Sequence, residues 1–124
     1  MARRWAVHGL TVLGVTVLVA GLVATGGPGQ GRAEKRDRTR DNDLAQIETL
    51  LDCKAQQAGQ VVVDPTPTEA CPMTPRLADP FTAAPYRVEL VPPDSVRLCA
   101  DFEQPAEMSL RDEAGCRVGR IEIR

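Results

Sequence analysis

The residues whose spacing says most about chemistry are four cysteines. They are separated by 18, 28 and 17 positions and stand at Cys53, Cys71, Cys99 and Cys116. A thioredoxin-like site needs two cysteines with two residues between them (C-x-x-C), and a zinc ribbon needs two such pairs, so the sequence excludes both. All four cysteines follow an apolar run near the N-terminus. An even cysteine number behind a membrane-targeting segment predicts a disulfide-stapled domain in an oxidising compartment.

Other catalytic groups are scarce. His8 is the single histidine and lies within the apolar run, which excludes a Ser-His-Asp or Cys-His pair in the rest of the chain. Two acidic groups remain, Glu48 with Asp52, and Asp101, Glu103, Asp112 and Glu113. We interpret both as solvated charges rather than as a paired-carboxylate site. The sequence therefore predicts no catalytic residue, cofactor, metal site or small-molecule substrate, and a protein that is not an enzyme.

The charge is unevenly distributed along the chain. Residues 1–41 carry seven Lys/Arg and three Asp/Glu, a net +4, whereas residues 42–124 carry eight and fourteen, a net −6. An acidic domain argues against nucleic acid as its partner. The basic stretch could meet anionic lipid headgroups, although a solvated tether is the interpretation that we favour.

An uncharged stretch, Ala6–Thr25, follows Arg3 and Arg4. Twenty helical residues span about 30 Å, the thickness of a bilayer core, so the segment can contact membrane lipid along its length. A signal-peptidase site is poorly formed at Leu22-Val23-Ala24, because a large residue stands where a small one is required. We therefore expect residues 1–25 to be an uncleaved signal-anchor. The alternative is a cleaved signal peptide.

Two rules disagree about orientation. Five basic residues follow the anchor within twenty positions, and the positive-inside rule would keep the C-terminal domain in the cytoplasm. The cysteines indicate the opposite side, and we follow them. The prediction is a single-pass cell-membrane protein with its soluble domain extracytoplasmic.

Glycines and a proline over Gly26–Gly31 predict a flexible joint, and residues 26–41 a Gly/Pro-rich and basic linker. Helical periodicity runs from about Arg38 to Ala58. Its apolar stripe consists of Leu44, Ile47, Leu51, Ala55 and Ala58. One of Asp41, Asn42 and Asp43 is expected to cap its N-terminus, and Gly59 to end it. Residues 42–124 are the predicted disulfide-stapled domain.

Prolines punctuate residues 61–85, which predicts an extended loop with room for a short strand at Val61–Val63. A bridge from Cys53 to Cys71 in this loop would add about 3 kcal/mol of stability in the chain-entropy model. Cys99 and Cys116 would join strands or a strand to its return loop. Four cysteines allow three connectivities, and the other pairings stay open.

The C-terminal third has the alternating pattern of an antiparallel sheet. Tyr86, Val88 and Leu90 form the first alternating set, and Pro92–Ser95 supplies the turn. The second and third strands are expected over Val96–Phe102 and Cys116–Ile123. The face bearing Arg87, Glu89 and Arg97 is a candidate protein-contact surface, with a solvated face as the favoured alternative. The predicted fold is α+β: an N-terminal membrane helix, then one amphipathic helix packed on three to four antiparallel strands.

Several segments together resemble the soluble domain of pilin-like and type II secretion pseudopilin-like membrane proteins, over roughly residues 35–117. They are Asp43–Leu51, Cys71-Pro72, Asp79–Tyr86, Arg97–Glu103 and Ala114–Cys116. In those proteins a basic stalk leads into a D-L-x-Q-I helix, and a D-P-x-T-x-x-P-Y turn opens a small antiparallel sheet.

The resemblance implies a helix packed on a small sheet, no catalysis, and a structural role for the pair Cys99 and Cys116. Two features differ from pilins. Gly14 stands where they carry a glutamate, and Gly26–Gly31 interrupts a helix that they continue. We therefore expect a non-catalytic, membrane-anchored cell-envelope protein that acts by protein–protein contact in assembly or secretion. The alternative is a secreted, disulfide-stapled binding module released by signal-peptide cleavage.

Overall fold

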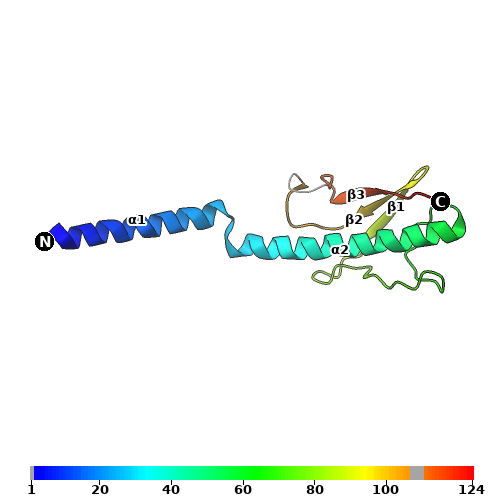
Figure 1. The fold of residues 1–124 in the computed structure, drawn as a ribbon, viewed down its shortest axis with the longest axis horizontal. Helices are drawn as coiled ribbons and strands as arrows, with labels where there is room; N and C mark the ends of the chain where they lie inside the picture. Colours follow the sequence, from blue (N-terminus) through cyan, green and yellow to red (C-terminus); the bar gives the residue numbers. More distant parts are fainter. Residues whose placement is uncertain (1, 107–110) are drawn as a thin grey trace. The chain divides into compact units, whose positions relative to one another are not determined.

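A computed structural model describes residues 2–106 and 111–124 of the chain. They divide into two compact units, Met1–Glu34 and Lys35–Arg124. Helix α1, Ala2–Ala24, belongs to the first unit and has no buried residue. It contains the apolar window that is long enough to cross a membrane. The second unit combines a helix with a three-stranded antiparallel sheet, an α+β arrangement (Figure 1).

Helix α2 is longer than the sequence predicts. It runs over Gly27–Ala58, so the expectation of a joint over Gly26–Gly31 and of a helix starting near Arg38 is wrong. Only Thr25 and Gly26 separate the two helices, with φ of 81° at Gly26. Pro28 lies in the first turn of α2, where the missing N–H has no helical partner in any case. The glycines that follow weaken this turn without ending the helix.

The expectations for the two ends of α2 have different outcomes. Asp41, Asn42 and Asp43 lie inside the helix and do not cap it. Gly59 does end it, with φ of 70° and an N–H that donates to the carbonyl of Ala55 at 2.8 Å. A left-handed residue directly after the last turn is the usual glycine cap.

The main core forms between α2 and the sheet. Its buried members are Leu44, Ile47, Leu51, Ala55, Val96, Leu98, Ala100 and Ile121. Ala58, expected on the same stripe, is exposed. Leu50 is fully buried but lies outside this cluster. The buried surface of α2 is therefore broader than the stripe expected from the sequence.

Three strands form the sheet in the order β1-β2-β3: Arg87–Val91, Ser95–Cys99 and Cys116–Arg120. Both pairings are antiparallel, with Glu89 opposite Arg97 and Arg97 opposite Val118. A turn at 92–94 joins the first two strands. The second and third strands end earlier than expected, at Cys99 and Arg120. Beyond them, Ala100 and Ile121 still join the core.

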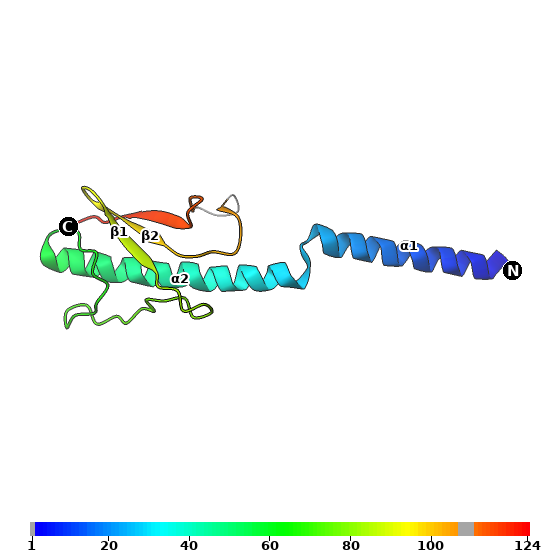
Figure 2. The same cartoon turned by 180° about the vertical axis from the view of Figure 1, so that it is seen from behind.

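The proline-punctuated segment 61–85 lies on the side of α2 away from the sheet (Figures 1 and 2). Val61–Val63 is not a strand, although Val61 packs against the core. The segment is fastened to α2 by the disulfide Cys53–Cys71 and by Lys54, whose ammonium donates to the carbonyls of Asp64 and Thr66. Prolines have no N–H group and cannot complete the backbone hydrogen bonds of a strand. The disulfide and the Lys54 side chain therefore hold this segment in their place.

Removal of the Cys53–Cys71 bridge tests how this segment is held. We expect the Cys53→Ser/Cys71→Ser double variant of the full chain in detergent to lose about 3 kcal/mol of unfolding free energy. Amide exchange should accelerate at Tyr86, whose N–H donates to the carbonyl of Leu77. The matched control is Cys99→Ser/Cys116→Ser, which opens a loop of similar length elsewhere. Unchanged exchange at Tyr86 in the first variant would show that the bridge does not hold the segment.

Candidate functional site

All four cysteines are engaged in disulfides. Cys53 joins Cys71 with Cα atoms 6.0 Å apart, and Cys99 joins Cys116 with Cα atoms 4.0 Å apart. Three of the four are buried, with Cys53 half-buried. Oxidised sulfur is neither a nucleophile nor a thiolate ligand, so these residues crosslink the fold.

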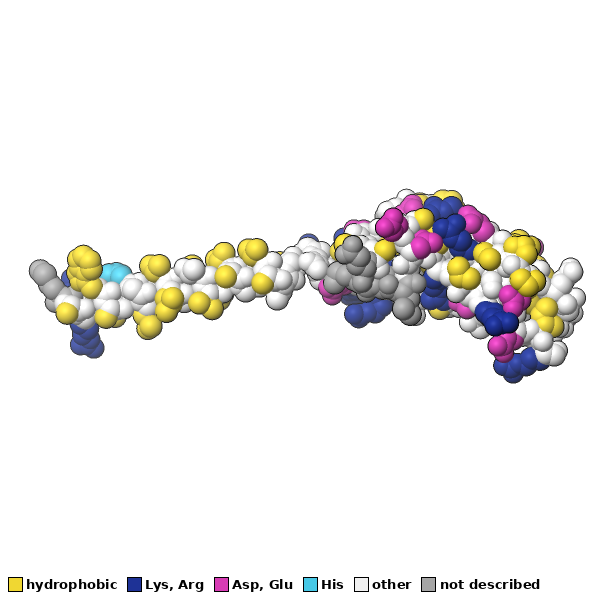
Figure 3. Space-filling view, turned by 90° about the horizontal axis from the view of Figure 1, so that it is seen from above, with side chains coloured by type: hydrophobic (Ala, Val, Ile, Leu, Met, Phe, Trp, Pro, Cys, Tyr) yellow, Lys and Arg dark blue, Asp and Glu magenta, His cyan; other side chains and the backbone are white. Residues whose placement is uncertain are grey.

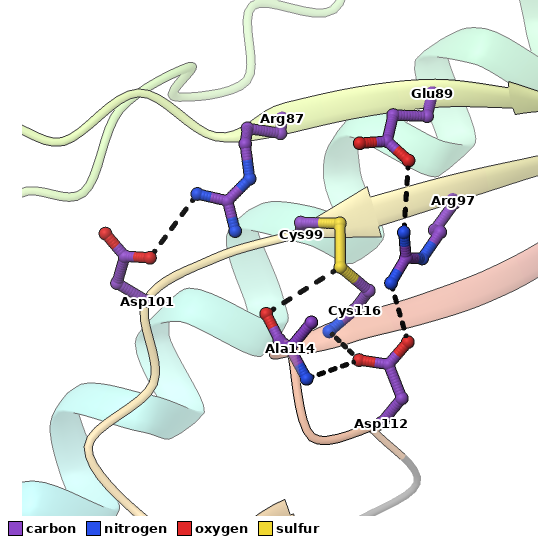
Figure 4. The surroundings of a disulfide bond; sticks show 8 residues. All are labelled: Arg87, Glu89, Arg97, Cys99, Asp101, Asp112, Ala114 and Cys116. Atoms are coloured by element: carbon purple, nitrogen blue, oxygen red, sulfur yellow. Dashed lines mark hydrogen bonds and ion pairs between the residues drawn. A yellow bond between two sulfur atoms is a disulfide. The ribbon is translucent and has the colours of Figure 1, made fainter.

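The sheet's outer face carries a row of ion pairs beside the Cys99–Cys116 bridge (Figure 4). The Arg97 guanidinium lies 3.2 Å from a carboxylate oxygen of Glu89 and 3.0 Å from one of Asp112. Arg87 lies 3.4 Å from Asp101. Exposed ion pairs of this kind contribute about 0–1 kcal/mol each to the stability of a fold. The main effect of the row is therefore a charged, solvated face.

The carboxylates that the sequence groups together have different partners. Asp101 pairs with Arg87, Asp112 with Arg97, and Glu103 with Arg36. Glu48, on α2, pairs with Arg117 of β3 at 2.6 Å. Over residues 2–106 and 111–124, no three His, Cys, Asp or Glu side chains are grouped so that they could hold a metal ion. Glu48 is thereby tied to β3, whereas Asp101, Glu103 and Asp112 are tied to three different arginines.

The most unusual group of side chains surrounds Arg40, which is 1 % exposed. Its Nε lies 2.6 Å from Oδ2 of Asp79, and its Nη1 lies 2.8 Å from both Asp37 and Glu103. Asp37 and Asp79 are each 2 % exposed. A buried guanidinium is tolerated only where carboxylates satisfy its donors, and this one meets three of them.

Burial alone would lower the pKa of Arg40, but the hydrogen bonds from the guanidinium to Glu103, Asp79 and Asp37 raise that pKa above its ordinary value. The cation is therefore permanent. We call Asp37, Arg40, Asp79 and Glu103 the Arg40 cluster.

Asp37 fastens the segment that follows β2. Its two carboxylate oxygens accept the backbone N–H groups of Glu103 at 2.9 Å and Gln104 at 2.8 Å. Arg36 adds a bidentate pair with the Glu103 carboxylate, at 2.6 and 2.7 Å. The hydrogen bonds from Arg36 and Arg40 lower the pKa of Glu103 to about 2. Glu103 therefore stays ionised throughout the ordinary pH range.

Asp79 holds the turn over Asp79–Tyr86, which we call the proline turn, in a similar way. Its Oδ1 accepts the N–H of Phe81 at 2.8 Å, and its carbonyl accepts the N–H of Ala83 at 2.8 Å. Burial alone would raise the pKa of Asp79, but the Phe81 N–H and Arg40 lower it overall. The turn places Ala83 at φ of 63°, a left-handed conformation that costs a residue with a Cβ about 1 kcal/mol.

A further buried carboxylate lies on α2, three residues beyond Arg40. Asp43, 1 % exposed, accepts the hydroxyl of Tyr86 at 2.7 Å and lies 3.3 Å from the Nε of Arg76. Burial, followed by the bond to Asp43, raises the pKa of Tyr86 above its ordinary value. Its hydroxyl is therefore a constant donor that joins the start of β1 to α2.

Sequence reasoning missed the Arg40 cluster because it placed the residues before position 42 in a linker. A signal was nevertheless present, since Asp37 and Arg40 extend the helical spacing of Leu44 and Ile47 by about two further turns. Charged residues on the core face of a helix indicate a buried ion pair if the partners arrive from elsewhere. The partners, Asp79 and Glu103, are 39 and 63 positions from Arg40, and no local pattern identifies them.

Comparison with known proteins adds no relative, because no protein-family model, no curated protein and no solved structure matches the chain. The chemistry of the second unit therefore has to be judged from its own geometry. Its cysteine sulfurs form disulfides, and most of its buried charges form ion pairs between segments. Both kinds of link hold the domain together.

Replacement of the central guanidinium tests its structural role. We expect Arg40→Met in the full chain to lose about 3–5 kcal/mol of unfolding free energy, because Asp79 would lose its cation and Asp37 would keep only the more distant Arg111, at 3.9 Å. Arg38→Met, at an exposed position of the same helix, is the control and should change stability by about 0.5 kcal/mol or less. Denaturant unfolding followed by circular dichroism measures both. Equal stability of the two variants would refute the role of the cluster.

The pKa of Glu103 gives a pH prediction. It lies at about 2 in the folded protein, below the ordinary 4.5, so Glu103 stabilises the fold above about pH 4.5. This contribution should disappear as the pH falls from about 5 to 2, because the unfolded chain takes up the proton first. Asp79 and Asp112, whose pKa values are also lowered, act in the same direction. Glu103→Gln should show a shallower loss of unfolding free energy over this range than Glu89→Gln, and equal slopes would contradict the assignment.

Proposed function

We propose that this chain is a membrane-anchored cell-envelope protein whose disulfide-stapled C-terminal domain acts by protein–protein contact, without catalysis, in assembly or secretion. The proposal keeps the pilin-like interpretation of the sequence. A helix beside a small antiparallel sheet, with a disulfide that joins the end of β2 to the start of β3, supports that interpretation at the level of architecture. The packing of the helix through one amphipathic face belongs to the proposal.

The observation that carries the anchor is the surface of α1. Its large apolar side chains are all exposed, between 52 % at Val19 and Leu22 and 80 % at Trp5, and they line the helix in Figure 3. Exposure to water costs about 25 cal/mol for each Å² of apolar surface, which an isolated helix cannot offset. A bilayer removes this cost and also requires the closed backbone hydrogen bonding that a helix provides.

The mode of action rests on the second unit. Two disulfides support delivery to an oxidising compartment, outside the cytoplasm. The outer sheet face carries mixed charges held in pairs, and Figure 3 shows acidic and basic side chains next to one another on that unit. Such a rigid, charged surface suits recognition of a partner by complementarity.

Fractionation with intact-mass analysis tests the anchor. We expect full-length protein in the carbonate-resistant membrane fraction, four hydrogens lighter than the reduced chain because each of the two disulfides removes two. Leu13→Arg/Val17→Arg should abolish membrane retention, since an arginine at a helix centre costs about 2.5–3.5 kcal/mol. Leu13→Val/Val17→Leu is the matched control and should stay in the membrane.

Two outcomes would replace the proposal. A soluble species shortened near Thr25 would indicate the secreted binding module. Free thiols in the native protein would indicate the cytoplasm and overturn the extracytoplasmic assignment.

A further inference from the structure

The third strand of the sheet leaves part of its outer edge unpaired. In β3 the odd-numbered residues face β2, because Ala100 donates to the carbonyl of Gly115 and Ile121 donates to that of Asp94. Backbone groups alternate in direction along a strand, so the even-numbered residues of β3 face outward. The outward N–H and C=O groups are those at positions 116, 118, 120 and 122.

Side chains already occupy both ends of this edge. Cys116 exchanges hydrogen bonds with Asp112, from its N–H to Oδ1 at 3.0 Å and to its carbonyl from the Asp112 N–H at 2.9 Å. At the other end the Gln56 amide donates to the carbonyl of Glu122 and accepts the N–H of Arg124. Between them, nothing in residues 2–106 and 111–124 hydrogen-bonds the outward backbone groups of Val118 and Arg120. The open stretch therefore matches a short extended segment of another chain.

A hollow of about 350 Å³ lies beside this open stretch, between α2 and β3. It is lined by Ala45, Glu48, Thr49, Asp52, Arg117, Arg120 and Ile121. Gly119 contributes no side chain there, and a Cβ at this position would come within 2.5 Å of the Glu48 carboxylate. The absent side chain therefore leaves room for the Glu48–Arg117 pair at the floor of the hollow.

The charge of the hollow favours a cation. Glu48 is paired with Arg117, and Arg120 with Asp94, which leaves Asp52 as the lining charge without an ion pair in the described part of the chain. Asp52 is exposed and lies on the α2 wall. A lysine or arginine side chain that enters from an added strand would meet this carboxylate.

We propose that the open edge of β3 binds an extended segment of a partner protein by strand addition, with a lysine or arginine side chain in the hollow against Asp52. Neighbouring side chains of an added strand point to opposite faces of the sheet. The residue next to the cation therefore lies beside Val118, which is 61 % exposed on the outer face. The partner segment alternates cationic and apolar residues. This inference rests on the proposed protein–protein function and names the surface that performs it.

The opposite edge of the sheet is a natural internal control. Tyr86 donates outward to the carbonyl of Leu77, and Asp79 donates to that of Ala84. The chain's own segment Leu77–Asp79 therefore lies along the start of the β1 edge. Further along β1, the outward groups of Val88 and Leu90 also have no hydrogen-bond partner in the described part of the chain. The β1 edge therefore tests whether the hollow beside β3, and not an open edge alone, selects the added strand.

A synthetic peptide tests the proposal on the full chain in detergent micelles. The probe is an acetylated and amidated pentapeptide of alternating lysine and valine, and the control peptide has glutamate in place of lysine. We expect the lysine peptide to bind and to slow amide exchange at Val118 and Arg120, while exchange at Val88 and Leu90 of β1 stays unchanged. The glutamate peptide should bind at least about fivefold more weakly, since it places a like charge beside Asp52.

Two variants separate the backbone contribution from the charge contribution. Val118→Pro removes the outward N–H and should weaken the lysine peptide about tenfold. Asp52→Asn should weaken it about two- to fivefold and bring the two peptides closer together in affinity. Leu90→Pro and Glu69→Gln are the matched controls at the other edge and at an exposed acid.

Loss of folding is excluded by the circular dichroism spectrum of each variant. Absence of binding at millimolar peptide, equal binding of the two peptides, or protection at β1 instead of β3 would overturn the proposal. Membrane fractionation does not involve this edge, so a failure here leaves the anchor intact. A protein found soluble in that experiment could still bind the peptide.

Discussion

The second unit is built around one buried guanidinium, because a charge that is removed from water has to be paired inside the protein. Arg40 lies on the core-facing side of α2 at a level where the helix has no apolar side chain to bury. Its charge is tolerated only when Asp37, Asp79 and Glu103 are all in place, because the penalty for a lone buried ion exceeds the gain from any single pair. These carboxylates come from α2, from the proline turn and from the segment after β2. The three segments therefore reach their positions together or not at all.

Aromatic rings lie over Arg40 and over Arg111, a second arginine with a buried side chain, whose guanidinium is 3.9 Å from Asp37. The second unit has few aromatic rings, and two of them lie over guanidinium groups. The guanidinium carbon is 5.5 Å from the ring centre for Arg40 and Phe81, and 3.5 Å for Arg111 and Phe102. A ring over a desolvated guanidinium adds cation–π attraction to its apolar burial. A domain of about 90 residues has a small core, and this one supplements it with ions, rings and disulfides rather than with more aliphatic volume.

Local patterns in the sequence predicted the elements well and their boundaries less well. Alternation found all three strands of the described sheet, and threefold and fourfold spacing found the central part of α2. The start of α2 was missed because glycine and proline were weighed as helix breakers without regard to their place in a first turn. The Arg40 cluster could not be derived, since Asp79 and Glu103 have no fixed distance in sequence from Arg40. Which strand edge stays open likewise depends on hydrogen bonds that only the tertiary structure defines.

The order of the disulfides along the chain has a consequence for biogenesis. Each cysteine is joined to a neighbour in sequence, the first to the second and the third to the fourth. A chain that crosses a membrane from its N-terminal side exposes Cys53 and Cys71 to the oxidant before Cys99 emerges. In the proposed extracytoplasmic location, oxidation in the order of arrival therefore joins the pairs that the structure contains.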